Sequence, residues 1–204
     1  MSSSNVVALV MAAGYSRRFG ESDKRCAPLV DGRSLLAASV ANAEQAFPLL
    51  RVAIRDEDDA TLLGLADNTP LIRLHQAHLG LGASLAEAVA ALSQDARLNR
   101  VEAVAILLGD MPWIQQETLL SLQQLATHST ILRPWYKGKP GHPVIFGRTL
   151  WPALETLSGH SGAKDIIRNN ASHYHEYHVQ DAGTLTDIDI PADLAAPNAI
   201  PDEA

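Results

Sequence analysis

The sequence predicts a three-layer α/β/α fold, Rossmann-like, in which helices cover both faces of a mostly parallel sheet. One observation is that short apolar, β-rich runs such as Val6–Met11 and Ala103–Leu108 recur along the chain. Another is that segments with apolar residues at helical spacing separate these runs. Strands that alternate with helices of this length imply crossover connections, and therefore mostly parallel neighbours.

The expected elements follow in chain order. The apolar, β-rich runs predict strands at 6–11, 50–54, 71–74, 103–108, 130–134, 144–146 and 174–179. Helical spacing predicts helices at 34–46, 58–66, 84–92 and 116–126, with Ser84 as the N-cap of the third. We expect two more helices before the last strand and another starting near Pro191, where an N-terminal proline is favourable.

Length and composition fit one globular domain. The chain has 204 residues, of which 47% are apolar and 19% are charged. Such a chain is long enough to bury a full core and is unlike a disordered one. We expect a single domain over 1–204, with a core of about 5–196 and a flexible tail at 197–204.

Charge and targeting signals narrow the class of partner. The net charge of −7 argues against nucleic acid. The apolar runs are too short to span a membrane, the N-terminus lacks a signal-peptide pattern, and Cys26 is the single cysteine. We therefore expect a cytoplasmic protein. Its basic residues gather at 17–33 and 133–148, which suits a small polyanion.

The segment from Ala12 to Lys24 is the most informative part of the sequence. Small residues let the backbone approach a phosphate, and successive N–H groups form an anion-binding nest. Arg18 and Lys24 are placed to neutralise a triphosphate. The patterns of a Walker A loop and of a dinucleotide fingerprint are both absent. An ordinary strand-to-helix turn with exposed basic residues is the alternative.

A carboxylate follows the fourth expected strand. Ligands of open α/β sheets bind beyond the carboxyl ends of the strands, so Asp110 and the Gly14 loop belong on one edge. A carboxylate there can hold Mg²⁺ against phosphate oxygens. The alternative is that Asp110 caps the helix that follows Pro112. Asp189 or Asp187 would supply a second carboxylate; the alternative is that Asp193 and one of these two residues cap the helix near Pro191.

These motifs resemble those of the MobA-like NTP transferases, and most closely the molybdenum cofactor cytidylyltransferases (MocA-like). The loop Ala12–Gly20 with Lys24 is similar to their signature, roughly L-A-[AG]-G-x-S-x-R-[MF]-G with a Lys shortly after. The similarity extends over nearly the whole chain, from about Val6 to Leu194. Five further segments match in order: GLGASL at 80–85, GDMP at 109–112, GHPV at 141–144, SGAK at 161–164 and DIDIPADL at 187–194.

The resemblance implies a fold of the nucleotide-diphospho-sugar transferase type and a Mg²⁺-dependent nucleotidyl transfer. It implies metal binding by Asp110 and Asp189, with Asp189 preferred over Asp187. Arg18 and Lys24 would stabilise the leaving pyrophosphate, and Asp110 would act with them in catalysis. The remaining expected contacts are Ala12, Ala13, Gly14 and Ser16 to the phosphates, Gly80, Gly82 and Ser84 to the nucleoside, and His142 and Lys164 to the acceptor.

The resemblance also implies the substrates. CTP is expected as the donor, because Ala13 stands where guanylyl members more often have glycine. The expected acceptor is the molybdopterin form of the molybdenum cofactor, and a molybdoenzyme is an expected recipient. Alternatives are transfer to a phospholactate or a sugar phosphate, and a nucleotide-binding accessory protein without turnover. The chain departs from the family pattern next to the nucleotide loop, where Arg25-Cys26 replaces the usual apolar residues.

Two other motifs have simpler interpretations. His173, His175 and His178 have a spacing that zinc can use, but no Cys is near them, and a solvated strand face is the preferred interpretation. Cys26 lies two residues from Lys24, whose charge would lower the thiol pKa. We interpret Cys26 as a small packed thiol, not as a nucleophile.

Overall fold

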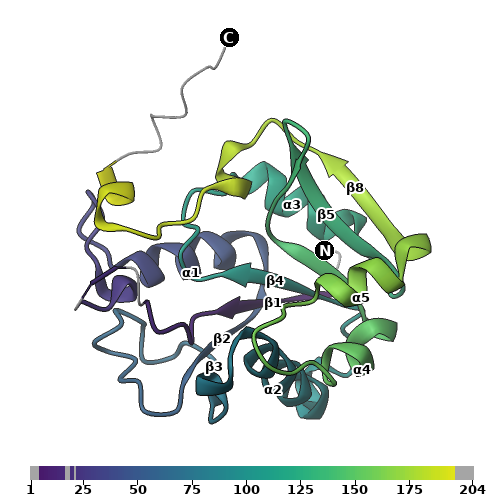
Figure 1. Ribbon diagram of the computed structural model, residues 1–204, viewed down its shortest axis with the longest axis horizontal. Coiled ribbons are helices and arrows are strands. Elements are labelled where there is room, and N and C mark those ends of the chain that lie inside the picture. The colour runs from purple at the N-terminus through teal and green to yellow at the C-terminus, as the bar shows by residue number, and fades with distance from the viewer. Residues whose placement is uncertain (1–4, 17–18, 21, 196–204) are drawn as a thin grey trace.

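The structure, a computed structural model, describes residues 5–16, 19–20 and 22–195. Arg18 and the tail expected at 197–204 lie outside this part. A central sheet has helices on both of its faces (Figure 1). No helix in the described part of the chain combines the length and the apolar character needed to cross a membrane.

The sheet is mixed and mostly parallel, which confirms the predicted fold class. Its strand order is β3-β2-β1-β4-β7-β5-β6, and β8 also pairs with β5. The pairs β1–β2, β2–β3, β1–β4 and β5–β8 are parallel. The strands are β1 Val6–Met11, β2 Leu49–Arg55, β3 Leu71–Leu74, β4 Ala103–Leu108, β5 Ile131–Tyr136, β6 Lys139–Pro140, β7 Val144–Gly147 and β8 Tyr174–His178.

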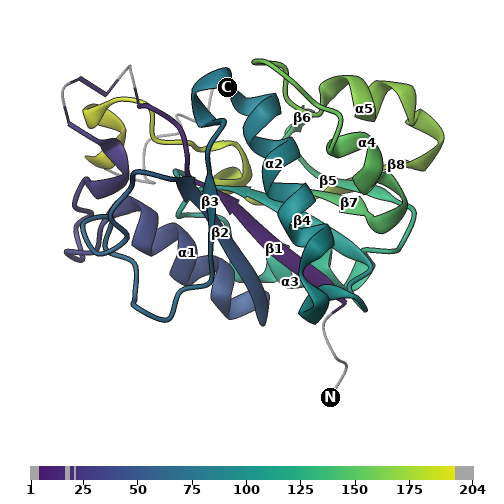
Figure 2. The same cartoon turned by 90° about the horizontal axis from the view of Figure 1, so that it is seen from below.

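Five α-helices of the described chain form the outer layers (Figure 2). They are α1 Leu35–Ala46, α2 Leu81–Gln94, α3 Gln116–Leu125, α4 Trp151–Leu154 and α5 Lys164–Asn169. Leu36 of α1 and Leu119 of α3 share one buried cluster. Leu85 of α2, Trp151 of α4 and Ile166 of α5 share the other. The sheet therefore lies between two layers of helices. One layer consists of α1 and α3, and the other consists of α2, α4 and α5.

Strand β1 shows why the chain needs both helical layers. All of its side chains are buried, and successive residues point to opposite faces of a sheet. Val6, Ala8 and Val10 join the cluster of α1 and α3. Val7, Leu9 and Met11 join the cluster of α2. An apolar run without alternation is thus satisfied only by a strand that is covered on both sides.

The register of the central strands brings two loops together. Met11 of β1 pairs with Leu108 of β4, so the two parallel strands end side by side. The Gly109 N–H donates to the Met11 carbonyl at 3.0 Å. A Cβ at Gly109 would lie 2.9 Å from the Leu36 side chain and 3.1 Å from Ala12 Cβ, so only glycine lets the loops approach this closely.

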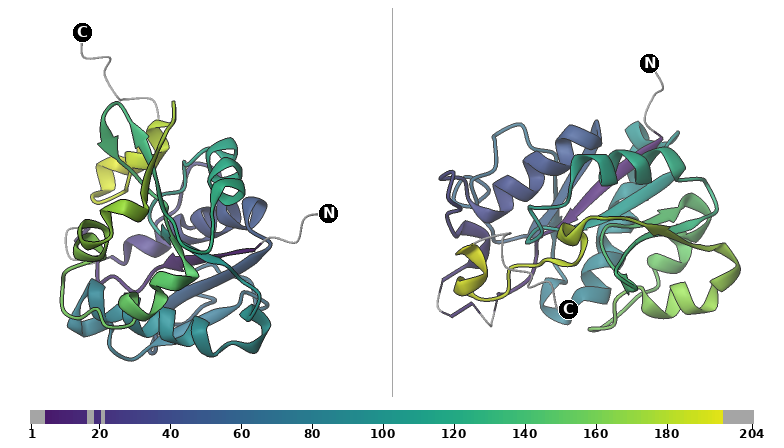
Figure 3. Two further views of the ribbon diagram at one scale, coloured as in Figure 1. Left: turned by 90° about the vertical axis from the view of Figure 1, so that its right-hand side faces the viewer. Right: turned by 90° about the horizontal axis from the view of Figure 1, so that it is seen from above.

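The C-terminal segment returns to this edge of the sheet. Ile188 is buried against Phe19 and Leu35, and its N–H donates to the Asp110 carbonyl at 3.1 Å. Both views in Figure 3 show the yellow segment beside the N-terminal part of the chain. Packing of one apolar side chain therefore carries its acidic neighbours to the end of β4.

One predicted helix is wrong. Residues 58–66 form turns, and their side chains hydrogen-bond in ways that compete with a helix. The Asp59 carboxylate accepts from Thr61 N and Leu62 N at 2.9 and 3.3 Å. Asp58 is held by arginines, and Gly64 adopts a left-handed φ of +78°. The other predicted strands and long helices are present, with shifted ends.

The predicted N-cap of α2 is also wrong. The helix begins at Leu81, and Gly80 is its N-cap. Ser84 lies in the first turn and its hydroxyl donates to the Gly80 carbonyl at 3.0 Å. The N-cap of α1 is Ser34, whose hydroxyl accepts from Ala37 N at 3.1 Å.

Candidate active site

A cavity of about 410 Å³ lies at the carboxyl ends of β1 and β4. Its walls come from the loop after β1, the start of α2, the end of β4 and the segment around Asp189. It is lined by nine of the residues predicted for the site: Ala12, Ala13, Gly14, Ser16, Lys24, Gly80, Ser84, Asp110 and Asp189. The cavity thus brings together residues that are far apart in the sequence.

The loop after β1 offers room for a ligand. A Cβ added at Gly14 would meet nothing within 4 Å, so the backbone there faces open space. Ser16 has a φ of 51°, in the left-handed region. Its hydroxyl oxygen is buried and has no hydrogen-bond partner among the described residues. The backbone and this hydroxyl can therefore meet an anion at the cavity.

Three carboxylates converge at the cavity edge. Asp110, Asp187 and Asp189 each place an oxygen within 4.8 Å of the others. Asp110 lies two residues beyond the end of β4, and Ile188 anchors the segment that carries the other two. Only one of Asp187 and Asp189 was expected to supply a carboxylate at this edge. The structure brings both there, although only Asp189 lines the cavity.

The environment of the cluster affects its protonation. Burial raises the pKa of Asp187, and the charges of Asp189 and Asp110 raise it further. The Asp110 oxygen Oδ1 is buried and has no hydrogen-bond partner in the described structure. Converging carboxylates with an unsatisfied oxygen suit a hard divalent cation, which prefers oxygen ligands. The residues present therefore fit the expected metal.

Lys24 contacts this cluster directly. Its Nζ donates to Asp110 Oδ2 at 2.6 Å, to the Ile188 carbonyl at 2.9 Å and to Asp189 Oδ1 at 3.3 Å. Burial lowers the pKa of Lys24, but hydrogen bonds and charges from Asp110 and Asp189 raise it above its usual value overall. The side chain is thus a charged ammonium at neutral pH.

The helix-capping alternatives can be compared with the contacts. The N–H of Gln115, the residue before α3, donates to Asp181 at 2.9 Å, so Asp110 does not serve as that cap. Asp193 Oδ2 accepts from Asp189 N and Ile190 N, both at 2.9 Å. Asp193 therefore fixes the turn, which leaves the Asp189 side chain at the cavity.

Three predicted residues lie away from the cavity lining. Gly82 packs behind it, because its N–H donates to the Gly159 carbonyl at 2.8 Å. Lys164 is exposed at the start of α5. His142 is largely buried, and burial together with the Arg133 charge lowers its pKa to about 4. Its Nδ1 atom has no hydrogen-bond partner among the described residues.

The three histidines at and just before β8 do not extend the site, and neither does Cys26. His173, His175 and His178 are exposed, and in the described part only the aspartate cluster has metal-ligand spacing. Cys26 is exposed, and its Sγ lies 3.3 Å from the Leu62 carbonyl. Partial burial of the thiol, followed by the Asp23 charge, raises the pKa of Cys26, which is opposite to the predicted direction. The expectation of a packed thiol is therefore wrong as well.

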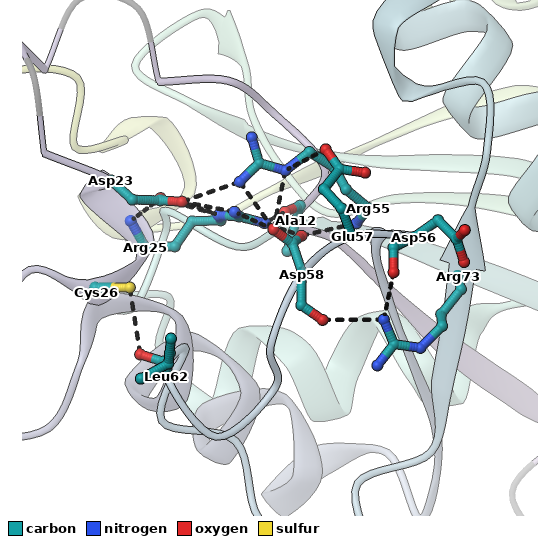
Figure 4. A network of polar contacts seen from close by, with 10 residues as sticks. All are labelled: Ala12, Asp23, Arg25, Cys26, Arg55, Asp56, Glu57, Asp58, Leu62 and Arg73. Atoms are coloured by element: carbon teal, nitrogen blue, oxygen red, sulfur yellow. Dashed lines mark hydrogen bonds and ion pairs between the residues drawn. The ribbon is translucent and has the colours of Figure 1, made fainter.

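Sequence reasoning missed several residues at the cavity. Tyr15, His78, Leu81 and His160 line it. Arg25 also lines it, although its side chain is buried in a network of ion pairs (Figure 4). The departure of Arg25 from the family pattern was the available signal, because a charged residue at an apolar position requires partners.

Comparisons with known proteins found a matching family model and a relative of similar length. The model of the MobA-like NTP transferase domain matches residues 8–177. The chain is 27% identical over 203 residues to the Purine catabolism protein PucB of Bacillus subtilis, covering 94% of this chain and 95% of that protein.

Two solved structures are similar over most of their length. The Rv0371c homologue from Mycobacterium sp. strain JC1 has 31% identity and a TM-score of 0.78, with 93% of each chain covered. Mycobacterium tuberculosis Rv0371c in complex with manganese has 25% identity and a TM-score of 0.75. That comparison covers 92% of this chain and 94% of the other.

Proposed function

Since the chain belongs to the MobA-like NTP transferase family and is a nucleotidyltransferase, we propose that it transfers CMP from CTP to molybdopterin, in the molybdenum form of the cofactor. In this reaction an acceptor phosphate oxygen forms a bond to the α-phosphorus of CTP, and the bond to pyrophosphate breaks. An acceptor phosphate is an anion near neutral pH, so the reaction requires positioning and charge neutralisation more than a strong base.

The observation that supports this proposal is the contact of Lys24 with Asp110 beside the open Gly14 loop. The Lys24 Nζ atom lies 2.6 Å from Asp110, and all three residues line one cavity. A metal-bound triphosphate requires an ammonium group, carboxylates that hold the metal and a loop whose backbone N–H groups are accessible. A purely structural turn has no need to collect them.

Each group has a proposed role. Backbone amides from Ala13 to Ser16 hold the phosphates, and the Ala12 backbone completes this wall. Lys24 and Arg18 stabilise the leaving pyrophosphate by charge-assisted hydrogen bonds. Gly80 and Ser84 bound the nucleoside. Gly82 acts indirectly, by letting α2 pack closely against the Gly159 loop.

Asp110 and Asp189 are proposed to hold Mg²⁺, with Asp187 beside them. When bound, the cation would neutralise phosphate charge. Support comes from the convergence of the three carboxylates and from the manganese complex of the similar Rv0371c structure.

The acceptor is proposed to lie on the side of the cavity toward His142 and Lys164. Lys164 is four residues beyond His160, which lines the cavity. An ammonium on that side suits a phosphorylated pterin. A molybdoenzyme in the cytoplasm would then receive the product. Phospholactate and sugar phosphates are the alternative acceptors, and an accessory protein would bind nucleotide without forming product.

The base is proposed to be cytosine. Ala13 is nearly buried and lines the cavity, so its methyl group takes space that a purine would need. One methyl group changes discrimination by about 1–3 kcal/mol, which is a preference and not an exclusion.

Calorimetric titration with CTP and GTP in the presence of Mg²⁺ tests the base. CTP should bind about 5- to 100-fold more tightly, and Ala13→Gly should narrow the difference. Tighter binding of GTP by the parent protein would contradict the cytosine assignment. Mass spectrometry after incubation with CTP and each acceptor then separates a cytidylylated pterin from a cytidylylated phospholactate or sugar phosphate. Absence of any product would favour the accessory protein.

A further inference from the structure

The Arg25 side chain donates hydrogen bonds to three residues near the cavity, and it has no part in the proposed reaction. Its guanidinium is buried and donates to Asp23, Asp58 and the Ala12 carbonyl (Figure 4). Both oxygens of Asp58 accept from it, at 2.6 and 2.8 Å. Arg55 reaches the same two aspartates, at 2.8 and 3.1 Å. Two arginines and two aspartates thus form a network of ion pairs, and exposed Glu57 also lies 3.7 Å from Arg55 Nε.

The network is connected to the cavity wall at two points. The first is Ala12, whose N–H donates to the Ala53 carbonyl at 2.8 Å and whose own carbonyl accepts from Arg25 at 2.7 Å. The second is Tyr15, whose ring lies 4.8 Å from the Arg55 guanidinium. The two connections lie on either side of Ala13 and Gly14, so the network fixes the backbone around two of the residues proposed to meet the phosphates.

Arg25 also constrains Lys24, its neighbour in the short 3-10 helix Lys24–Cys26 (η1). Asp23 caps this helix by accepting from Arg25 N at 3.0 Å. Arg25 then enters the network, whereas Lys24 reaches Asp110 across the cavity. A flexible lysine is placed well only if its backbone is fixed, and the buried Arg25 fixes it.

We propose that Arg25 is a positioning residue, which acts through Ala12 and Lys24 to hold the triphosphate-binding groups in place. This inference rests on the proposed function, because a nucleoside triphosphate is taken as the ligand. A merely structural Arg25 would affect unfolding, whereas a positioning Arg25 affects the β- and γ-phosphate contacts of Lys24 in particular.

A double-mutant cycle of Arg25→Met and Lys24→Met tests the proposal. Calorimetry with Mg²⁺ gives the Kd values of CTP and CMP, and of GTP and GMP, for the parent, both single variants and the double variant. Arg25→Met should weaken triphosphate binding by about 10-fold and monophosphate binding by less than about 2-fold. In the Lys24→Met background the loss caused by Arg25→Met should be clearly smaller than about 10-fold, because only the contact with Ala12 remains to transmit it. Independent, additive losses would overturn the proposal.

Arg51→Met is the matched control. Arg51 is another nearly buried arginine, paired with Asp95 at the end of α2 opposite the cavity. Its loss should lower the melting temperature and leave triphosphate affinity unchanged. Equal effects of Arg25→Met and Arg51→Met on triphosphate binding would contradict the positioning role.

Two further outcomes distinguish failure of the positioning role from failure of the proposed function. If Arg25→Met does not fold, the same cycle is measured with Arg25→Lys, which keeps the charge but cannot bridge three acceptors in the same geometry. If the parent binds no triphosphate, the proposed function fails. If the parent binds triphosphate and Arg25 variants bind it equally well, only the positioning role fails.

Discussion

At the scale of single residues, Lys24 lies beside the proposed binding sites of both the metal ion and the triphosphate. Its ammonium contacts Asp110 and Asp189, the two carboxylates proposed to hold the cation. A cation entering the cluster therefore meets a positive charge already close to its ligands. In the nucleotide complex, the same ammonium is expected to turn toward the phosphates.

Lys24→Met should thus have opposite effects on two ligands. Removing the ammonium should tighten Mn²⁺ binding to the nucleotide-free protein by about 5- to 10-fold, while triphosphate binding weakens. Electron paramagnetic resonance of free Mn²⁺ measures the first effect. Lys139→Met removes the same charge from exposed β6 and should change neither affinity. Weaker Mn²⁺ binding in Lys24→Met would show that the ammonium supports the metal instead of opposing it.

His142 gives a prediction about stability and pH. Its pKa is lowered to about 4 in the folded protein, from an ordinary value of 6.5. Between these values the unfolded chain binds the additional proton, so stability falls as pH falls. From pH 7 to pH 5 the free energy of unfolding should decrease by about 2 kcal/mol on account of this residue.

Urea unfolding at the two pH values measures this decrease. His142→Asn removes the titrating group, so the difference between pH 7 and pH 5 should become smaller by that amount. His178→Asn, at an exposed position on β8, serves as the control for the loss of an imidazole. An unchanged pH dependence in His142→Asn would mean that the imidazole titrates normally.

The sequence was informative about residues that follow strands. Gly14 and Asp110 could be placed together, because adjacent parallel strands end at the same edge. The partners of Arg25 could not be predicted, since Asp58 belongs to a turn that was taken for a helix. His160 was equally hidden, because it reaches the cavity through packing of its loop on α2. Whether the nine lining residues act as proposed stays a prediction.

At the scale of elements, α2 illustrates how tertiary contacts move a helix end. Apolar spacing and a favourable cap residue placed its start at Ser84, yet the helix begins at Leu81. The Gly159 carbonyl accepts from Gly82 N and so satisfies an N–H that the first turn leaves unpaired. Sequence propensity contains no information about that distant carbonyl.

Gly82→Ala tests this packing. An added Cβ would lie 2.5 Å from the Ser161 carbonyl oxygen and 2.6 Å from that of Ser158, so the backbone must shift. We expect a loss of about 1–3 kcal/mol in unfolding free energy, measured in urea. Gly14→Ala, whose Cβ would meet nothing within 4 Å, should unfold like the parent but bind triphosphate less well. Equal stability of Gly82→Ala and the parent would contradict the close packing.

At the scale of the whole molecule, the sheet topology determines what can meet. The mixed sheet places β1 and β4 side by side although about 90 residues separate them. The C-terminal segment then crosses back to Asp110 and adds Asp187 and Asp189. The fold class was predictable because alternating strands and helices allow few arrangements. The return of the C-terminal segment was indicated only by resemblance, because it depends on one buried isoleucine.

Asp110 and Lys24 are proposed to act together in metal-dependent nucleotidyl transfer. The most direct measurement is pyrophosphate release from CTP, with the molybdenum form of molybdopterin and Mg²⁺, by the parent protein and by Asp110→Asn. We expect pyrophosphate release that requires the metal and that is about 100-fold or more slower in Asp110→Asn. Asp165→Asn, an exposed aspartate of α5, should match the parent. Release at the parental rate by Asp110→Asn under limiting Mg²⁺ would contradict the account.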